Sequence, residues 1–329
     1  MKHLMYVPFT GLGLKGGFRG DTWLKNRLEV FKKFVIPSLI NQKNRDFTLW
    51  VQWRPEEEGN HLVMQLHKTL EGIRDFPFIF TYGGLCFEDD KYDRPVSLER
   101  LQANLKATLP HLQEVVGKEE TVLMTIQPSD DLYLSHAVKA IQDKAKSIAI
   151  PQTPQSIGYR QGYMMNYRTL ELAEYANQDQ NDKTDEESTY NTYTIPPFFT
   201  VMFPRAVFLD PEAHMKWTGP YRSHEYIGDH TKYHALEGPG FIVGTHGENI
   251  STTWTHRYKG KMIEGDEKET VMLQAGLFGV DKLELDQDKG RVVEKKVINF
   301  LPKPIMRAWM RLRSPGIGSA INDYNHYRP

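Results

Sequence analysis

Two adjacent carboxylates follow an apolar run near the middle of the chain. The triplet Ser129-Asp130-Asp131 comes shortly after residues 122–126, and a helix-like stretch follows it. A short buried strand that ends in acids just before a helix delivers carboxylates to the edge of an α/β sheet, where such sheets bind ligands. Two carboxylates there suit Mg²⁺ or Mn²⁺, ions that usually carry substrate phosphates as further ligands. The alternative is a solvated turn in which an Asp caps the next helix.

A histidine follows a second apolar run, at residues 241–245. His246 stands beside Gly247, with Asn249 three positions on. A neutral imidazole would complete a metal site that has only one or two Asp ligands, or it would contact a diphosphate. The alternative is a hydrogen-bonded structural histidine, and Asn249 either binds substrate or caps the turn.

A third polar segment, at residues 224–230, holds two acids and two histidines. Inverting glycosyl transfer needs one such group to take the proton of the acceptor hydroxyl. We rank Asp229 first and Glu225 second for this role, and a simple polar turn is the alternative.

The N-terminal region offers a cation and a glycine-rich loop. Arg27 lies on a helical pattern, where it either pairs with phosphate or uracil-type oxygens or stays on a solvated face. Residues 11–16 spell G-x-G-x-x-G, but glycines continue to Gly20 before any helix begins. The dinucleotide fingerprint requires its last glycine to open a helix directly. A loop over a phosphate-bearing substrate, or a plain surface loop, fits better, and Thr10 at its start is a donor-binding candidate.

Strand and helix patterns alternate along the first half of the chain. Strands are expected at residues 3–9, 47–53, 76–81 and 121–126, and helices at 23–40, 56–73, 98–116 and 134–145. This alternation predicts an α/β fold of Rossmann type, with a mostly parallel sheet and helices on both faces. After residue 150 we expect strands at 157–167, 198–203 and 241–245 and a helix at 271–279. We therefore predict one composite domain, with residues 1–150 as a nucleotide-binding half and residues 151–329 as an acceptor-binding and C-terminal half.

The composition indicates which binding partners and which cellular compartment to expect. The net charge of -1 creates no general attraction to nucleic acid, so no nucleic acid partner is expected. The single cysteine, Cys86, excludes an internal disulfide and fits a reducing compartment, and we expect a cytoplasmic protein. The basic, apolar segment at residues 305–313 would either rest on a membrane surface or pack as a terminal helix.

Three separated blocks resemble one family. The blocks are Arg27, Phe31, Pro37-Ser38-Leu39, Gln42 and Phe47; then Ser129-Asp130-Asp131; then residues 246–251. Together they resemble the rhamnosyltransferase family of bacterial and viral glycosyltransferases, over about residues 20–255.

That resemblance implies a GT-A-like fold. It also implies transfer of a sugar, L-rhamnose, from a nucleotide-sugar donor to a glycan or other hydroxyl acceptor. Asp130 and Asp131 would match the family's D-x-D-like metal motif, with His246 as a further ligand and Arg27, Ser129, Asp130 and Asn249 at the donor. Gln127 and Pro128 stand where the usual motif carries a further acid or arginine.

The chemistry expected of such a site is inverting transfer assisted by Mn²⁺ or Mg²⁺. The ion would neutralise charge on the departing diphosphate, and the sugar would become oxocarbenium-like. Two alternatives stay open. One is a non-catalytic nucleotide-sugar-binding protein of the same fold, and the other is an NAD(P)-dependent oxidoreductase built on the glycine loop.

Overall fold

A single mixed sheet forms the centre of the protein. The computed structural model describes residues 1–10, 21–83, 94–176, 198–217, 231–247, 254 and 259–285. The strands of this part run in the order β10-β7-β6-β8-β4-β1-β2-β3, and β9 pairs with both β5 and β6. Their bounds are β1 Lys2–Pro8, β2 Thr48–Gln52, β3 Phe78–Thr81, β4 Thr121–Ile126, β5 Leu132–Tyr133, β6 Gln155–Asn166, β7 Glu171–Tyr175, β8 Phe199–Pro204, β9 Lys232–Thr245 and β10 Lys259–Ile263.

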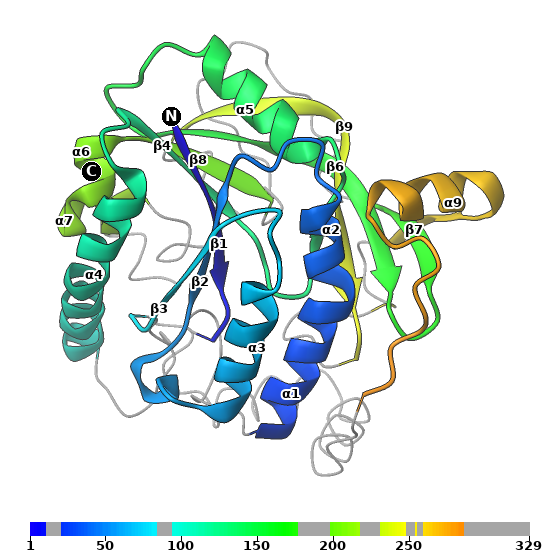
Figure 1. Cartoon of the computed structure of the whole chain (residues 1–329). Coiled ribbons are helices and arrows are strands. Elements are labelled where there is room, and N and C mark those ends of the chain that lie inside the picture. The colour runs from blue at the N-terminus through cyan, green and yellow to red at the C-terminus, as the bar shows by residue number, and fades with distance from the viewer. Residues whose placement is uncertain are drawn as a thin grey trace, which may run out of the picture.

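The first four strands in the chain, β1 to β4, form a parallel block. β1 pairs in parallel with β4 on one side and with β2 on the other, and β2 pairs in parallel with β3. Beyond β4 the pairing becomes antiparallel, except for β6 and β9. The carboxyl ends of β1, β2 and β4 therefore meet at one sheet edge, below the N label in Figure 1. The predicted α/β class and its parallel Rossmann-type half are confirmed.

Helices cover both faces of the parallel block (Figure 1). Alternate β1 residues face opposite ways: Met5 and Val7 join the core that includes α1, α2, α3 and α5, whereas Leu4 and Tyr6 join the core against α4 and α6. This two-sided burial explains why the strand is apolar at nearly every position. The helix bounds are α1 Asp21–Val30, α2 Ile36–Ile40, α3 His61–Glu71, α4 Arg94–Val116, α5 Ala137–Ser147, α6 Arg205–Leu209, α7 Pro211–Trp217 and α9 Gly265–Gln274.

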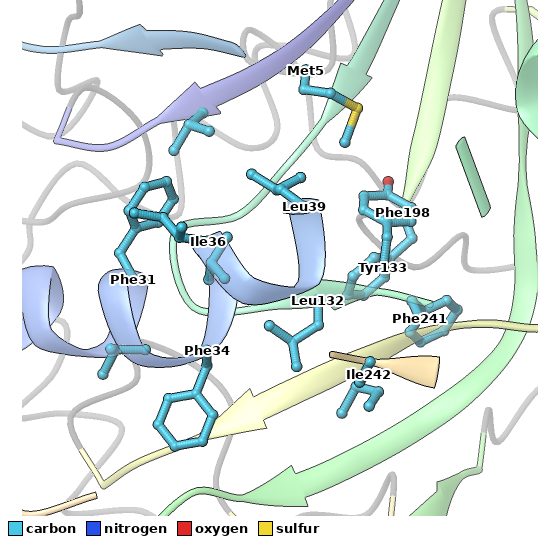
Figure 2. Packing of buried hydrophobic residues seen from close by; sticks show 14 of the residues in the cluster. Met5, Phe31, Phe34, Ile36, Leu39, Leu132, Tyr133, Phe198, Phe241 and Ile242 are labelled. Carbon is cyan, nitrogen blue, oxygen red and sulfur yellow. The ribbon is translucent and has the colours of Figure 1, made fainter. Parts of the chain in front are cut away.

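The predicted helix at residues 23–40 is continuous but changes pitch. A π-helical turn, Phe31–Val35, joins α1 to α2. Pro37 lacks an amide hydrogen, and its ring crowds the carbonyl one turn earlier, so widening the helix just before it relieves the conflict. Phe31, Phe34, Ile36 and Leu39 still point into the core (Figure 2).

Gln42 ties the end of this helix to the segment after the acidic pair. Its side-chain amide donates to the backbone oxygens of Ser38 and Tyr133, at 3.0 and 3.1 Å. Its oxygen accepts from the amide of Val138 at 3.2 Å. The helix and the segment that carries β5 are thus fixed to each other, and Leu132 and Tyr133 pack beside Leu39 in the core (Figure 2).

Strand prediction was least accurate after residue 150. The strand predicted at 241–245 is the end of the much longer β9, whose first eight residues are exposed or partly exposed and include Gly238 and Pro239. β7 and β10 were missed because both are short and carry charged residues. The last predicted helix, 271–279, begins earlier, as α9. Within the described part of the chain, no helix has the length and apolar character needed to span a membrane.

Candidate functional site

Three residues from distant parts of the chain converge at the carboxyl edge of the parallel block. Arg27 comes from α1, Asp130 from the turn after β4, and His246 from the end of β9. The Arg27 guanidinium forms an ion pair with the Asp130 carboxylate. His246 Nε2 lies 3.2 Å from the same carboxylate and 3.2 Å from Arg27 Nη1. We name Arg27, Asp130 and His246 the charged cluster.

Burial makes the charged cluster electrostatically strong. The side chains of Arg27 and His246 are only 6% and 2% exposed, and that of Asp130 is 13% exposed. Burial alone would raise the pKa of Asp130, but the charges and hydrogen bonds of Arg27 and His246 outweigh it and hold that pKa well below its usual range. Asp130 is therefore a carboxylate at any physiological pH. Arg27 Nε is buried and finds no hydrogen-bond partner among the described residues.

Asp131 points to a different partner from Asp130. Its carboxylate accepts a hydrogen bond of 2.8 Å from the amide of Gly244 on β9. Burial and the neighbouring charge of Asp130 raise the pKa of Asp131 well above its usual range, and the Gly244 hydrogen bond opposes this only in part. The pKa values of the two adjacent acids are thus shifted in opposite directions.

Backbone contacts hold the acidic turn in place. The Gln127 side chain donates to the carbonyls of Pro128 and Asp131, at 2.8 and 2.7 Å. The Tyr167 hydroxyl donates to the Asp130 carbonyl at 2.8 Å. A side chain on Gly244 would collide with that carbonyl and with the Tyr167 hydroxyl, so glycine is required there. Sequence reasoning missed Tyr167 and Gly244, which carry no signal apart from a glycine inside a strand pattern.

Thr10 and Ser129 are both buried at this edge. The Thr10 hydroxyl donates to the Glu57 carboxylate and accepts from the Arg54 amide at 3.2 Å. Thr10 therefore links the ends of β1 and β2. Its role in donor binding, like that of Ser129, stays a prediction.

Several predicted features lie outside the described residues. They are Asp229, Glu225 and Asn249, the glycine loop at 11–20, Cys86 and the segment 305–313. The proposed base, the dinucleotide alternative and the membrane contact are therefore untested by this structure.

One cation that sequence reasoning missed lies over Gly247, the residue that follows His246 of the charged cluster. Arg168 follows β6 directly after Tyr167, and its guanidinium lies over Gly247, the neighbour of His246. The Gly247 φ of +85° is typical of glycine and leaves this face of the backbone bare.

The charged cluster supplies donors that Mn²⁺ accepts, but too few for a closed metal site. Among the described residues, no three His, Cys, Asp or Glu side chains are grouped as metal ligands. Asp130 and His246 converge, whereas Asp131 is turned toward Gly244. Two or three carboxylate and imidazole groups fit an ion whose remaining ligands are substrate phosphates and water.

No protein-family model and no curated protein sequence matches this chain. Membership of the rhamnosyltransferase family therefore stays a prediction from the three sequence blocks.

Among solved structures, the chain is similar to S. aureus TarS 1-349, with 12% identity, a TM-score of 0.36, and coverage of 74% of this chain and 60% of that one. Against the longer S. aureus TarS structure, this chain spans only 37% of that chain. Mouse xyloside xylosyltransferase 1, in its apo form, gives 11% identity, a TM-score of 0.35, and coverage of 72% of this chain and 85% of that one. Similarity at such low scores identifies no activity.

Proposed function

We propose that this protein is a glycosyltransferase that moves a sugar from a nucleotide-sugar donor to a hydroxyl acceptor. One observation carries the proposal. Arg27, Asp130 and His246 each come from a different block of the family resemblance, and they meet in one buried cluster although Arg27 and His246 are 219 positions apart. The cluster lies at the carboxyl edge of a parallel sheet, where α/β proteins bind their ligands.

The charges of the cluster suit a departing nucleoside diphosphate. Arg27 is a buried cation whose Nε–H has no partner among the described residues, so it would donate to a phosphate oxygen without losing an existing bond. His246 would contact the same group. A preorganised cation at a water-poor site stabilises the negative charge that develops on the leaving group.

We further propose that Mn²⁺ or Mg²⁺ assists, held by Asp131, Asp130 and His246. When bound, the ion would neutralise part of the diphosphate charge. The Asp130 carboxylate and His246 Nε2 already lie 3.2 Å apart. A rotation of the Asp131 side chain away from the Gly244 amide would add a third metal ligand. Arg27 then remains the ion-pair partner that keeps Asp130 ionised.

The transfer step is proposed to invert the anomeric carbon. The bond between this carbon and the phosphate oxygen breaks, and its electron pair leaves with the diphosphate. The acceptor oxygen forms the new bond and gives its proton to a base, for which Asp229 and then Glu225 are the candidates. If Asp229→Asn and Glu225→Gln both keep wild-type turnover, this base assignment is wrong.

The finer features of the proposal rest on the family resemblance. L-rhamnose is the proposed sugar, and a glycan or small hydroxyl compound is the proposed acceptor. Residues 1–150 would form the nucleotide-sugar-binding half, to which His246 and Asn249 contribute from the second half, and residues 151–329 would otherwise bind the acceptor. The segment 305–313 would provide any peripheral membrane contact.

A thermal-shift screen is the first test. Purified protein would be heated with UDP, GDP, dTDP and their sugar conjugates, and with NAD and NADP, each with and without Mn²⁺. A ligand that binds only the native state raises the melting temperature by mass action. A shift with one nucleoside diphosphate, followed by acceptor-dependent release of nucleotide, supports the proposal. A shift without such release indicates a non-catalytic binding protein, and a shift with NAD or NADP alone contradicts the proposal.

The metal is tested by donor binding rather than by turnover alone. Affinity for the nucleoside diphosphate would be measured with Mn²⁺ and with EDTA, in wild type and in Asp131→Asn. We expect EDTA to weaken wild-type binding and to have little effect on the variant. Equal wild-type affinity in both buffers would remove the ion from the scheme.

A further inference from the structure

Arg168 is an exposed basic residue that lies over Gly247, the residue after His246 of the charged cluster. Its position is set by local bonds: its amide donates to the Asn166 side chain at 3.0 Å, and the preceding residue, Tyr167, donates through its own amide to the Thr245 carbonyl at 2.9 Å. Because Tyr167 also bonds the Asp130 carbonyl, the backbone that carries Arg168 is fixed to the acidic turn.

The guanidinium of Arg168 lies flat against the bare face of Gly247. A Cβ built on that glycine would lie 3.5 Å from Nη1 and 3.6 Å from Cζ of Arg168, which is ordinary contact distance. Gly247 is exposed, whereas the adjacent His246 is buried. The dipeptide His246-Gly247 thus contacts two arginines: His246 meets Arg27, and Gly247 meets Arg168.

We propose that Arg168 binds the second phosphate group of the donor, so that the site selects nucleoside diphosphates over monophosphates. This inference rests on the proposed function. Arg27 is one fixed cation with an unused N–H, and a single phosphate would satisfy it. The exposed Arg168 guanidinium is planar and can donate two parallel hydrogen bonds to a phosphate group. It would supply a second anchor over Gly247, the residue that follows His246.

A solvated arginine with no ligand is the alternative, and most exposed arginines are of that kind. Two features set Arg168 apart. Its side chain rests on the glycine next to a buried histidine of the charged cluster, and the backbone that carries it is bonded to that cluster through Tyr167.

The test compares Arg168→Gln with wild type by calorimetry, with and without Mn²⁺. The ligands are UDP, UMP and inorganic pyrophosphate. If the wild type prefers another base, GDP or dTDP and its monophosphate replace UDP and UMP. We expect diphosphate and pyrophosphate affinity to fall about tenfold and monophosphate affinity to fall less than twofold, since a charge-assisted hydrogen bond contributes on this order. Arg168→Lys should recover part of the loss. Arg74→Gln, an exposed arginine before β3 at the opposite edge of the sheet, is the matched control and should bind like wild type.

Unchanged melting temperatures would show that each variant folds. Equal losses for UDP and UMP in Arg168→Gln, or no loss in either, would overturn the inference while leaving the proposed function intact. A wild type that binds no nucleoside diphosphate would overturn the proposed function itself and this inference with it.

Discussion

Two buried polar clusters flank β1 and β4, and they are built in opposite ways. The charged cluster lies just beyond the carboxyl ends of the strands. A neutral cluster lies within the sheet and against α5; its members are His3, Thr125, Thr200 and Gln142. His3 Nε2 bonds the Thr125 hydroxyl at 2.7 Å, and Nδ1 bonds the Gln142 amide at 3.1 Å, so both ring nitrogens have partners. In the charged cluster, by contrast, a buried Arg27 nitrogen has none among the described residues.

The difference separates a structural histidine from a ligand-binding one. Burial lowers the pKa of His3 to about 3, so it is a neutral element of the core with every hydrogen bond made inside the protein. His246 lies between a cation and a carboxylate, in a group that retains unused donor capacity. Buried polar groups that are fully paired stabilise a unique core, whereas a buried donor without a partner requires an explanation, and a bound phosphate is the one we propose for Arg27.

The largest expected effect is the loss of the buried ion pair. Asp130→Asn should destabilise the fold by about 3–5 kcal/mol, because it leaves the Arg27 charge buried without its counter-charge. Thr125→Val in the neutral cluster removes uncharged hydrogen bonds and should cost about 1–3 kcal/mol. Urea unfolding of both variants measures the gap. If Asp130→Asn costs no more than Thr125→Val, the two clusters do not differ as described.

A double variant separates stability from function. Arg27→Met combined with Asp130→Asn removes both charges and should regain most of the lost stability. Donor binding should stay absent, because the guanidinium is gone. Recovery of donor binding together with stability would show that the charged cluster is only structural.

The next effect concerns the close approach at Gly244. Gly244→Ala would force a Cβ against the Asp130 carbonyl and the Tyr167 hydroxyl, and such overpacking typically costs about 1–3 kcal/mol. Gly72→Ala is the matched control, because Gly72 has an ordinary φ of -74° and an exposed position after α3. We expect urea unfolding to show a loss only in the first variant, accompanied by weaker donor binding. Equal stability of the two variants would contradict the packing of the acidic turn against β9.

The sequence predicted the members of the charged cluster better than the residues that surround them. Arg27, Asp130 and His246 were each identified as chemical candidates, because an arginine on a helical pattern and an acid or histidine after an apolar strand pattern are visible in the sequence. Tyr167, Gly244 and Arg168 were not, since their roles depend on β9 lying beside β6, a long-range pairing that no local period encodes. The parallel half was predictable because its strands are continuous apolar runs, whereas β7 and β10 carry charges on short strands.

Acid should weaken the fold through two buried neutral histidines, His3 of the neutral cluster and His214, which lies outside that cluster. The pKa of His3 falls to about 3 and that of buried His214 to about 4, so the unfolded chain takes up protons below its ordinary histidine pKa while the folded chain does not. Stability contributed by neutral histidine is therefore complete above about pH 6.5 and falls as the pH drops toward 4. From pH 7 to 5, each histidine should cost about 2 kcal/mol.

The pH effect is measured as a difference between proteins. Asp131, whose pKa is raised, acts with the opposite sign over the same range, so the wild-type curve alone mixes the two. His3→Gln keeps a side chain that can hydrogen-bond to Thr125 and Gln142, and it removes the titratable imidazole. Urea unfolding at pH 7 and pH 5 should show a smaller loss in His3→Gln than in wild type, and identical losses would show that His3 is not buried as a neutral group.

The smallest predicted effect separates two tyrosines with the same chemistry. Tyr167 donates to the Asp130 carbonyl at 2.8 Å, and Tyr133 donates to the Ile126 carbonyl at 2.9 Å. Tyr167→Phe and Tyr133→Phe should each cost about 1 kcal/mol of stability, because each removes one buried hydrogen bond and leaves the ring packing intact. Only Tyr167→Phe should weaken nucleoside diphosphate binding, because only that hydroxyl holds the residue that pairs with Arg27. Calorimetric titration of both variants tests this, and equal affinities would show that the position of Asp130 does not depend on Tyr167.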